Sequence, residues 1–156
     1  MSKVMVIGAT SLLGQYMMAE ARSLGLEAVG TYKSTVPSDA GALRNLDIVE
    51  PDEVNERISQ EGPDMVVLCS ALTNVDRCER EPDLAYRVNA EGAFNVASAC
   101  RSSGSKMVFV STDYVFNGLK GGRYHEFDPP DPLSVYARSK LEGERVTLDA
   151  SRGNLV

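Results

Sequence analysis

Short apolar runs along the chain predict β-strands, and most of them are followed by a segment whose apolar residues have helical spacing. The runs are rich in Val, Ile and Met and do not alternate strictly with polar residues, which is typical of strands covered on both faces. Strands are expected at residues 3–7, 27–31, 43–46, 65–69 and 107–110. Helices are expected at residues 12–24, from Pro51 onward, at 82–103 and at 134–150.

The alternation of strands and helices indicates the fold class. Strands joined through helices run parallel, and such crossovers are right-handed in nearly all proteins. We therefore expect an α/β fold with a Rossmann-type, doubly wound parallel sheet. Residues 154–156 (Asn-Leu-Val) are expected to begin a sixth strand.

Composition and charge exclude several classes of protein. The chain has 156 residues, of which 43% are hydrophobic and 24% charged, and this suffices for one domain with a buried core. The net charge of −6 argues against a nucleic-acid-binding protein, which needs a basic face. We recognise no membrane span and no signal peptide, so a cytoplasmic protein that binds no membrane is expected.

The cysteines and the histidine predict no metal site. Cys69, Cys78 and Cys100 form no CxxC pair. Cys69 ends an apolar run and Cys100 lies in a helical pattern, so both are expected to be buried thiols. His125 is the only histidine, and we expect it to be a loop residue.

A glycine turn, "VIGATSLLGQ", follows the first strand and opens the first helix. Its spacing, Gly8-x-x-Ser11-x-x-Gly14, is that of a dinucleotide-binding turn with a serine in place of one glycine. The N–H groups at the helix start would face a pyrophosphate. The Cβ of Ser11 is expected to restrict the approach of the phosphate, and its hydroxyl could donate a hydrogen bond in return. A turn made only for packing has the same pattern.

The end of the second strand normally selects the cofactor, because an acidic residue there binds the ribose 2′-OH of NAD. Here the segment is "GTYKS", which has Lys33 and no acid. This favours NADP, with Thr31 and Ser34 as hydroxyl donors to the 2′-phosphate, and NADH as the alternative. A solvated loop lysine is the other interpretation. Asp47 and Ile48 follow the third strand, where they would meet the adenine or simply begin the next turn.

Two further segments carry candidate chemistry. In "SVYARSKLEGE", Tyr136 and Lys140 are four positions apart and share one helix face. A neighbouring ammonium is expected to lower the pKa of the phenol, so that the tyrosine can give a proton to a carbonyl oxygen. In "STDYVFNG", Ser111 and Thr112 would be hydroxyls at a strand end. An amphipathic tyrosine with a surface lysine, and an Asx-type turn, are the plain alternatives.

These motifs together resemble the extended short-chain dehydrogenase/reductase family and, within it, the dTDP-4-dehydrorhamnose reductases. The segments that carry the resemblance extend along essentially the whole chain: "IGATSLLGQ", "ALTNVDRCEREPDLAYRVNAEG", "STDYVFNG" and "PPDPLSVYARSKLEGE". The resemblance implies NADPH-dependent reduction of a 4-keto nucleotide-sugar. Thr112 would hydrogen-bond the substrate carbonyl, Tyr136 would donate the proton, and Lys140 would bind the nicotinamide ribose and tune Tyr136.

The resemblance also implies which residues bind the cofactor. The positions carried over, together with Lys33, are Gly8, Thr10, Ser11, Leu12, Leu13, Gly14, Asp47, Ile48, Ser70, Ala71, Thr73, Tyr136 and Lys140. Asn89 matches an asparagine common in the wider family, without a definite role.

The chain departs from this family in length. Residues 1–156 are expected to form one NAD(P)-binding Rossmann domain without the C-terminal part that binds the nucleotide-sugar, as a fragment, one of two chains or a degenerate product. The sheet edge beside the fifth strand would then be exposed, which favours a homodimer or poor solubility. Alternative functions are another nucleotide-sugar epimerase or dehydratase, and a non-catalytic subunit that resembles the beta subunit of methionine adenosyltransferase.

Overall fold

The computed structural model describes residues 2–34 and 43–156 of the chain. In these ranges no helix combines the length and the apolar character that crossing a membrane requires. The elements follow one another as β1 (Lys3–Ile7), α1 (Leu12–Ser23), β2 (Glu27–Tyr32), β3 (Leu43–Asn45), α2 (Pro51–Glu61), β4 (Met65–Leu68), α3 (Val75–Arg80), α4 (Pro82–Tyr86), a π-helical segment η2 (Arg87–Glu91), α5 (Gly92–Ser103), β5 (Lys106–Phe109), a 3₁₀ turn η3 (Asp113–Val115) and α6 (Val135–Ala150).

The five strands form one parallel sheet in the order β3-β2-β1-β4-β5. This confirms the predicted Rossmann-type fold. The chain leaves β1 toward β2 on one side and returns to β4 on the other, so the topological switch point lies between β1 and β4, where ligands of such sheets bind. Leu155 continues the sheet beyond β5 through a parallel bridge to Val108, so the edge that was expected to be exposed is covered in part.

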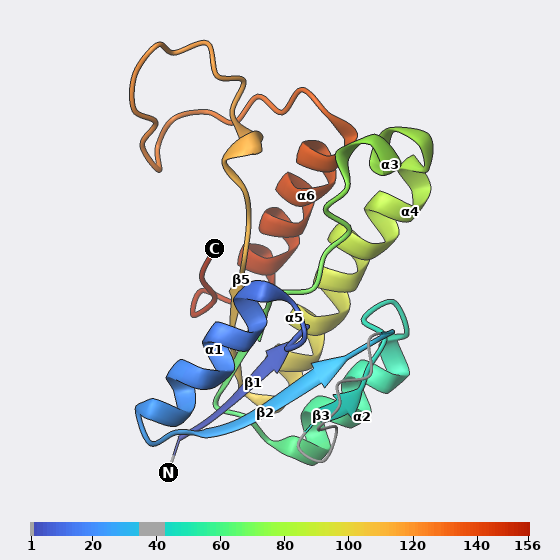
Figure 1. Cartoon of the computed structure of the whole chain (residues 1–156), viewed down its shortest axis with the longest axis vertical. Helices are drawn as coiled ribbons and strands as arrows, with labels where there is room; N and C mark the ends of the chain where they lie inside the picture. The colour runs from blue at the N-terminus through green and yellow to red at the C-terminus, as the bar shows by residue number, and fades with distance from the viewer. Residues whose placement is uncertain (1, 35–42) are drawn as a thin grey trace.

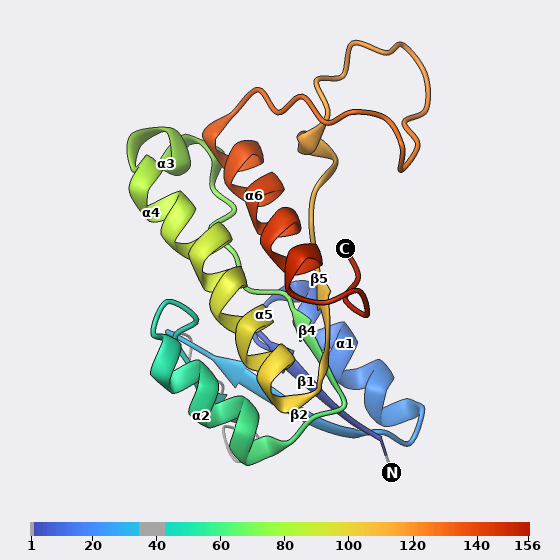
Figure 2. The ribbon, with the colours of Figure 1, turned by 180° about the vertical axis from the view of Figure 1, so that it is seen from behind.

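Helices lie on both faces of the sheet, with α1 on one face and α2, α5 and α6 on the other (Figures 1 and 2). Successive strand residues therefore enter different cores. Met5 and Ile7 pack with α2 and α5, whereas Val4 and Val6 pack toward α1. In the larger core, burial raises the pKa of the Cys100 thiol to about 12.

Two helical details differ from the prediction. The segment expected as one helix at residues 82–103 consists of α4, η2 and α5, and the π-helical residues in its middle include Asn89. The short helix α3 was not predicted, although Asn74 begins it as an N-cap by accepting a hydrogen bond from the Arg77 N–H at 2.8 Å. Six residues are too few for the apolar periodicity on which a sequence-based prediction depends.

Candidate active site

A hollow at the carboxyl ends of β1, β2 and β4 contains most of the residues predicted to hold a cofactor. It consists of two adjoining cavities of about 380 and 330 Å³, which share Lys33, Ser34, Ser70 and Ala71. The first is lined by Gly8, Thr10, Ser11, Lys33, Ser34, Cys69, Ser70, Ala71 and Thr73. Asp47 and Ile48 line the second. We call this hollow the cradle. It lies at the position where dinucleotides bind in folds of this kind.

The glycine turn makes the floor of the cradle out of backbone. Gly8 has a φ of +86°, and a Cβ on it would stand 2.9 Å from the Ser70 backbone nitrogen. A Cβ on Gly14 would stand 2.2 Å from the carbonyl oxygen of Gly8, so only glycine lets α1 approach the turn this closely. Gly14 does not itself line the cavities, and nor do Leu12 and Leu13, whose side chains are 78% and 43% exposed.

Ser11 has a structural task that explains why serine replaces the expected glycine. It is the N-cap of α1: its hydroxyl accepts a hydrogen bond from the Gly14 N–H at 3.0 Å and donates one to the Gly8 carbonyl at 2.8 Å. The hydroxyl therefore already uses its proton within the turn, in place of the expected donation to a phosphate.

Charged side chains gather where β2 ends. The Lys33 ammonium is 2.6 Å from the Asp47 carboxylate, and Arg77 lines the same cavity while pairing with Glu81 at 3.0 Å. Arg77 was not among the predicted residues, because its helix was not predicted. The expectation for Thr31 is wrong: its side chain is buried and accepts a hydrogen bond from the Gly8 N–H at 3.3 Å, so it does not face the cavity.

Tyr136 and Lys140 stand on consecutive turns of α6, as the spacing predicts. Ser134 fixes the start of this helix by accepting a hydrogen bond from the Ala137 N–H at 3.1 Å. Lys140 is only 3% exposed. Its ammonium donates to the carbonyl of Val110 at 2.6 Å and lies 3.9 Å from the centre of the Phe109 ring. The lysine thus spans the space between α6 and the end of β5.

The titration of the two side chains differs from the expectation. Burial lowers the pKa of Lys140 to about 8, an effect that the nearby Glu144 and Cys69 oppose. Burial raises the pKa of Tyr136, whereas the nearby Thr112 side chain lowers it, and Lys140 is not among the groups that act on this phenol. The predicted lowering of the Tyr136 pKa by Lys140 is therefore absent, and the tyrosine holds its proton at neutral pH.

Asn89 connects the cradle to α6. Its side chain is buried, accepts a hydrogen bond from the Leu72 N–H at 2.8 Å and donates to the Leu72 carbonyl and the Ser139 hydroxyl at 3.1 and 3.0 Å. Ser139 precedes Lys140, and Leu72 lies in the loop that carries Ser70 to Thr73. The π-helical segment brings this amide between the two, which gives Asn89 the role that the sequence did not define.

A third cavity, of about 700 Å³, is formed by the segment 113–124 and the residues just before α6. Its walls are Asp113, Tyr114, Phe116, Asn117, Gly118, Tyr124, Leu133 and Ser134. The Tyr114 ring meets the Tyr136 ring edge-on at a centroid distance of 6.0 Å, and Phe116 stacks on Tyr124 at 4.4 Å. The "STDYVFNG" segment thus leads from Thr112 into an aromatic wall. His125 lies in the loop that follows, as predicted.

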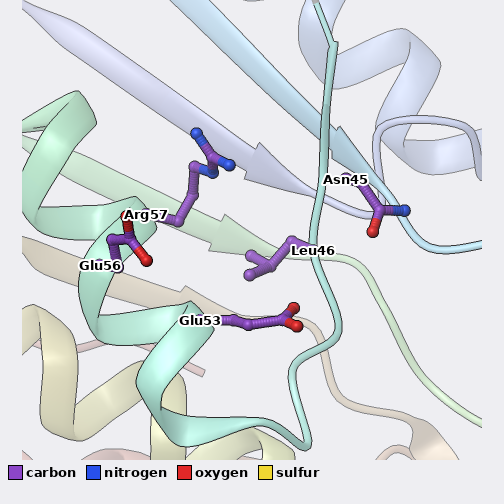
Figure 3. A pocket seen from close by; sticks show the side chains of 5 residues that line it. All are labelled: Asn45, Leu46, Glu53, Glu56 and Arg57. Carbon is purple, nitrogen blue, oxygen red and sulfur yellow. The ribbon is translucent and has the colours of Figure 1, made fainter.

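One more hollow contains none of the predicted residues. It lies between β3 and α2 and is lined by Asn45, Leu46, Glu53, Glu56 and Arg57 (Figure 3). The strand ends of β1, β4 and β5 contribute nothing to it, so we assign it no part in the chemistry.

Comparison with known proteins identifies the family. The model of the RmlD substrate binding domain family matches residues 2–156. The chain belongs to this family, a part of the extended short-chain dehydrogenases/reductases. The dTDP-4-dehydrorhamnose reductase of Mycobacterium tuberculosis is 38% identical over 152 residues, which cover 95% of this chain and 46% of the relative. The crystal structure of the Bacillus anthracis dTDP-4-dehydrorhamnose reductase in complex with NADP superposes with a TM-score of 0.85 at 33% identity, over 98% of this chain and 51% of that one.

The chain is also similar to a protein whose name describes no reductase. The beta subunit of methionine adenosyltransferase 2 from Bos taurus is 31% identical over 155 residues, which cover 99% of this chain and 45% of the relative. The chain spans about half the length of the curated relatives it matches. It is therefore homologous to NAD(P)-dependent reductases along the part that contains the cradle, Thr112, Tyr136 and Lys140.

Proposed function

We propose that this chain provides the cofactor-binding half and the catalytic residues of an NADPH-dependent reductase acting on a 4-keto nucleotide-sugar, as in dTDP-4-dehydrorhamnose reductases. The observation that carries this proposal is the position of Thr112 and Tyr136. The Thr112 side chain lies close enough to the Tyr136 phenol to lower its pKa, and the Tyr136 ring meets the ring of Tyr114, which lines the aromatic cavity. A carbonyl bound between the cradle and this cavity would have both hydroxyls within reach.

The cradle fits a dinucleotide. Gly8 leaves open the space that a Cβ would fill beside Ser70, and the N-terminus of α1 opens toward it, where a pyrophosphate is favoured. NADPH, when bound there, supplies the hydride for the carbonyl carbon. Tyr136 then donates its phenolic proton to the carbonyl oxygen, and the two transfers together convert the ketone into a secondary alcohol. The raised pKa of Tyr136 suits this direction, because the proton is present at neutral pH.

Thr112 and Lys140 support the proton transfer. Thr112 donates a hydrogen bond that polarises the carbonyl and holds the phenol in line. Lys140, which donates a hydrogen bond to the Val110 carbonyl, would offer its charge to the nicotinamide ribose. The phenolate is neutralised afterwards by a proton from solvent.

NADPH is the preferred cofactor in this proposal. Lys33, Arg77 and Ser34 line the cavity where the adenosine half would lie, and their donors suit a 2′-phosphate. Asp47 holds Lys33 at 2.6 Å and also offers an acceptor for a ribose hydroxyl, which leaves NADH as a weaker alternative.

A turnover assay with a dTDP-4-keto-sugar tests the proposal. The chain, supplied with the C-terminal half of a relative where needed, is expected to oxidise NADPH only when the keto-sugar is present. The Tyr136→Phe variant should lose this activity and keep NADPH binding. Equal activity of the variant and the wild type would contradict the proposal.

A non-catalytic cofactor-binding subunit is the second candidate, favoured by the similarity to the beta subunit of methionine adenosyltransferase 2. In that case the cradle would bind cofactor, and replacing Tyr136 would change no function of the protein. The same variant therefore separates the two candidates.

A further inference from the structure

Two side-chain hydrogen bonds join the end of β5 to α6. Of the two helix residues that make them, the sequence analysis identified Lys140 and not Glu144. The first is the hydrogen bond from the Lys140 ammonium to the Val110 carbonyl. The second is a hydrogen bond from the Ser111 hydroxyl to the Glu144 carboxylate. Glu144 follows Lys140 by one helical turn, and Ser111 follows Val110 directly. Two adjacent strand-end residues are therefore held by two side chains on one face of the helix.

This double attachment bears on the catalytic residues, because Thr112 is the next residue along the strand end. The Thr112 side chain must stay beside Tyr136, which is on the same helix one turn before Lys140. Glu144 and Ser111 are both partly buried, and thus the bond between them is shielded from competing water. Losing it would remove one of the two hydrogen bonds that join residues 110 and 111 to α6.

Glu144 also bears a negative charge one helical turn from Lys140, where it favours the charged form of the lysine. The groups that act on the lysine are Glu144 on its own helix and Cys69 after β4, while the Phe109 ring and the Val110 carbonyl of the strand contact its ammonium. Cys69 itself stays protonated, since burial raises the pKa of its thiol. Glu144 is thus the one carboxylate among these groups.

We propose that Glu144 is a positioning residue: its bond to Ser111, next to the bond between Lys140 and Val110, fixes the strand end that carries Thr112 and sets the carboxylate near the buried Lys140 ammonium. For its catalytic meaning this inference rests on the proposed reductase function. Its physical content, the coupling of Glu144 to Lys140, does not. Glu144 acts through Lys140 and Thr112 and needs no contact with substrate.

Nuclear magnetic resonance of the lysine side chains tests the coupling without any turnover. The chain has five lysines, so the ¹³Cε signals of protein labelled at lysine can be resolved and assigned with a Lys140→Arg variant. In the wild type the Lys140 signal is expected to titrate near pH 8. In Glu144→Gln the midpoint should fall by roughly one pH unit, because a nearby negative charge is removed from a buried cation.

Glu142→Gln is the matched control. Glu142 lies on the same helix and pairs with Arg145 at 3.1 Å, away from Lys140. This variant should leave the Lys140 midpoint where it is. An unchanged midpoint in Glu144→Gln, or equal shifts in both variants, would overturn the proposal.

The wild-type protein offers a second measurement in case Glu144→Gln does not fold. The side-chain carboxyl carbon of Glu144 should show a small inflection at the pH where Lys140 titrates, and Lys140→Arg should abolish it. A Glu144 signal that ignores the titration of Lys140 contradicts the coupling. Where turnover is measurable, the alkaline loss of kcat should move to lower pH in Glu144→Gln and return with Glu144→Asp. An inactive wild type with a normal Lys140 midpoint would count against the proposed function alone.

Discussion

The cradle and the catalytic corner, by which we mean the strand end 110–112 with Tyr136, Lys140 and Glu144, are built on different physical principles. The cradle is made by backbone: Gly8 and Gly14 allow approaches that any Cβ would block, and Ser11 closes the turn. The catalytic corner is made by side chains that are partly or fully buried and hold one another. Cofactor binding in the cradle should therefore depend on glycine at a few positions. The geometry of the corner should depend on the hydrogen-bond partners of its side chains and on pH.

The largest expected effect is at Tyr136 in the corner. Tyr136→Phe removes the proton donor and keeps the ring packed edge-on against Tyr114. We expect turnover to fall by about 10²- to 10⁴-fold, the usual contribution of a positioned acid. NADPH affinity, measured by fluorescence titration, should stay within about twofold. If turnover and NADPH affinity fell together, Tyr136 would contribute to cofactor binding as well as to proton transfer.

The second effect is on stability and concerns Lys140. Its pKa in the folded protein is about 8, below the ordinary value of 10.5, so the unfolded chain binds more protons between these two pH values. The free energy of unfolding should therefore rise as pH increases from about 8 to about 10.5, because the cost of burying the charge disappears. This cost is on the order of 3 kcal/mol. Lys140→Met should abolish this rise and be more stable than the wild type at pH 7 by about 1–3 kcal/mol.

Urea denaturation at pH 7 and at pH 10 measures this difference. A Lys140→Met variant that is less stable than the wild type at pH 7 would mean that the contacts to Val110 and Phe109 outweigh the cost of the buried charge.

The third effect tests the backbone of the cradle. Gly8→Ala is expected to lose at least about tenfold in NADPH affinity and roughly 1–2 kcal/mol in stability, because φ is +86° and the new Cβ would press on Ser70. Gly25→Ala is the matched control, since Gly25 has a φ of +71° with nothing within 4 Å. It should show a similar loss of stability and unchanged cofactor affinity. If Gly8→Ala bound NADPH as tightly as Gly25→Ala, Gly8 would have no part in cofactor binding.

The smallest effect distinguishes the two cofactors. Lys33→Met should weaken NADPH by about tenfold and leave NADH within about twofold, because only NADPH carries the 2′-phosphate. Asp47→Asn should act in the opposite direction, since it frees the Lys33 ammonium that Asp47 holds at 2.6 Å. Competition titrations with both cofactors measure the ratio. An unchanged ratio in both variants would show that Lys33 does not recognise the 2′-phosphate.

The sequence predicted the features that depend on local patterns better than those that depend on contacts between distant residues. The five strands, the glycine turn and the Tyr136–Lys140 spacing are local patterns, and each was predicted correctly within a residue or two. Ser11 was misread as a departure, although a serine three residues before Gly14 at a helix start is also the pattern of an N-cap. The expectation that the Ser11 hydroxyl donates a hydrogen bond to a phosphate overlooked this capping role.

What the sequence did not reveal depends on contacts between distant residues. Ser111 and Glu144 are 33 residues apart, and Asn89 and Ser139 are 50 apart, so no periodicity links them. The direction of the Tyr136 pKa was predicted wrongly, because helical spacing alone does not show that Lys140 turns toward Val110 and that burial dominates at the phenol. The extent of the domain, the homodimer, the cytoplasmic location and the sugar substrate stay predictions.

The most direct test of the central claim is a fluorescence titration of the purified chain with NADPH, with NADH as the comparator. The claim is that the carboxyl ends of β1, β2 and β4 form a dinucleotide site beside Tyr136. It predicts saturable binding, tighter for NADPH, that Gly8→Ala weakens and Tyr136→Phe leaves unchanged. A folded chain that binds neither cofactor would contradict it.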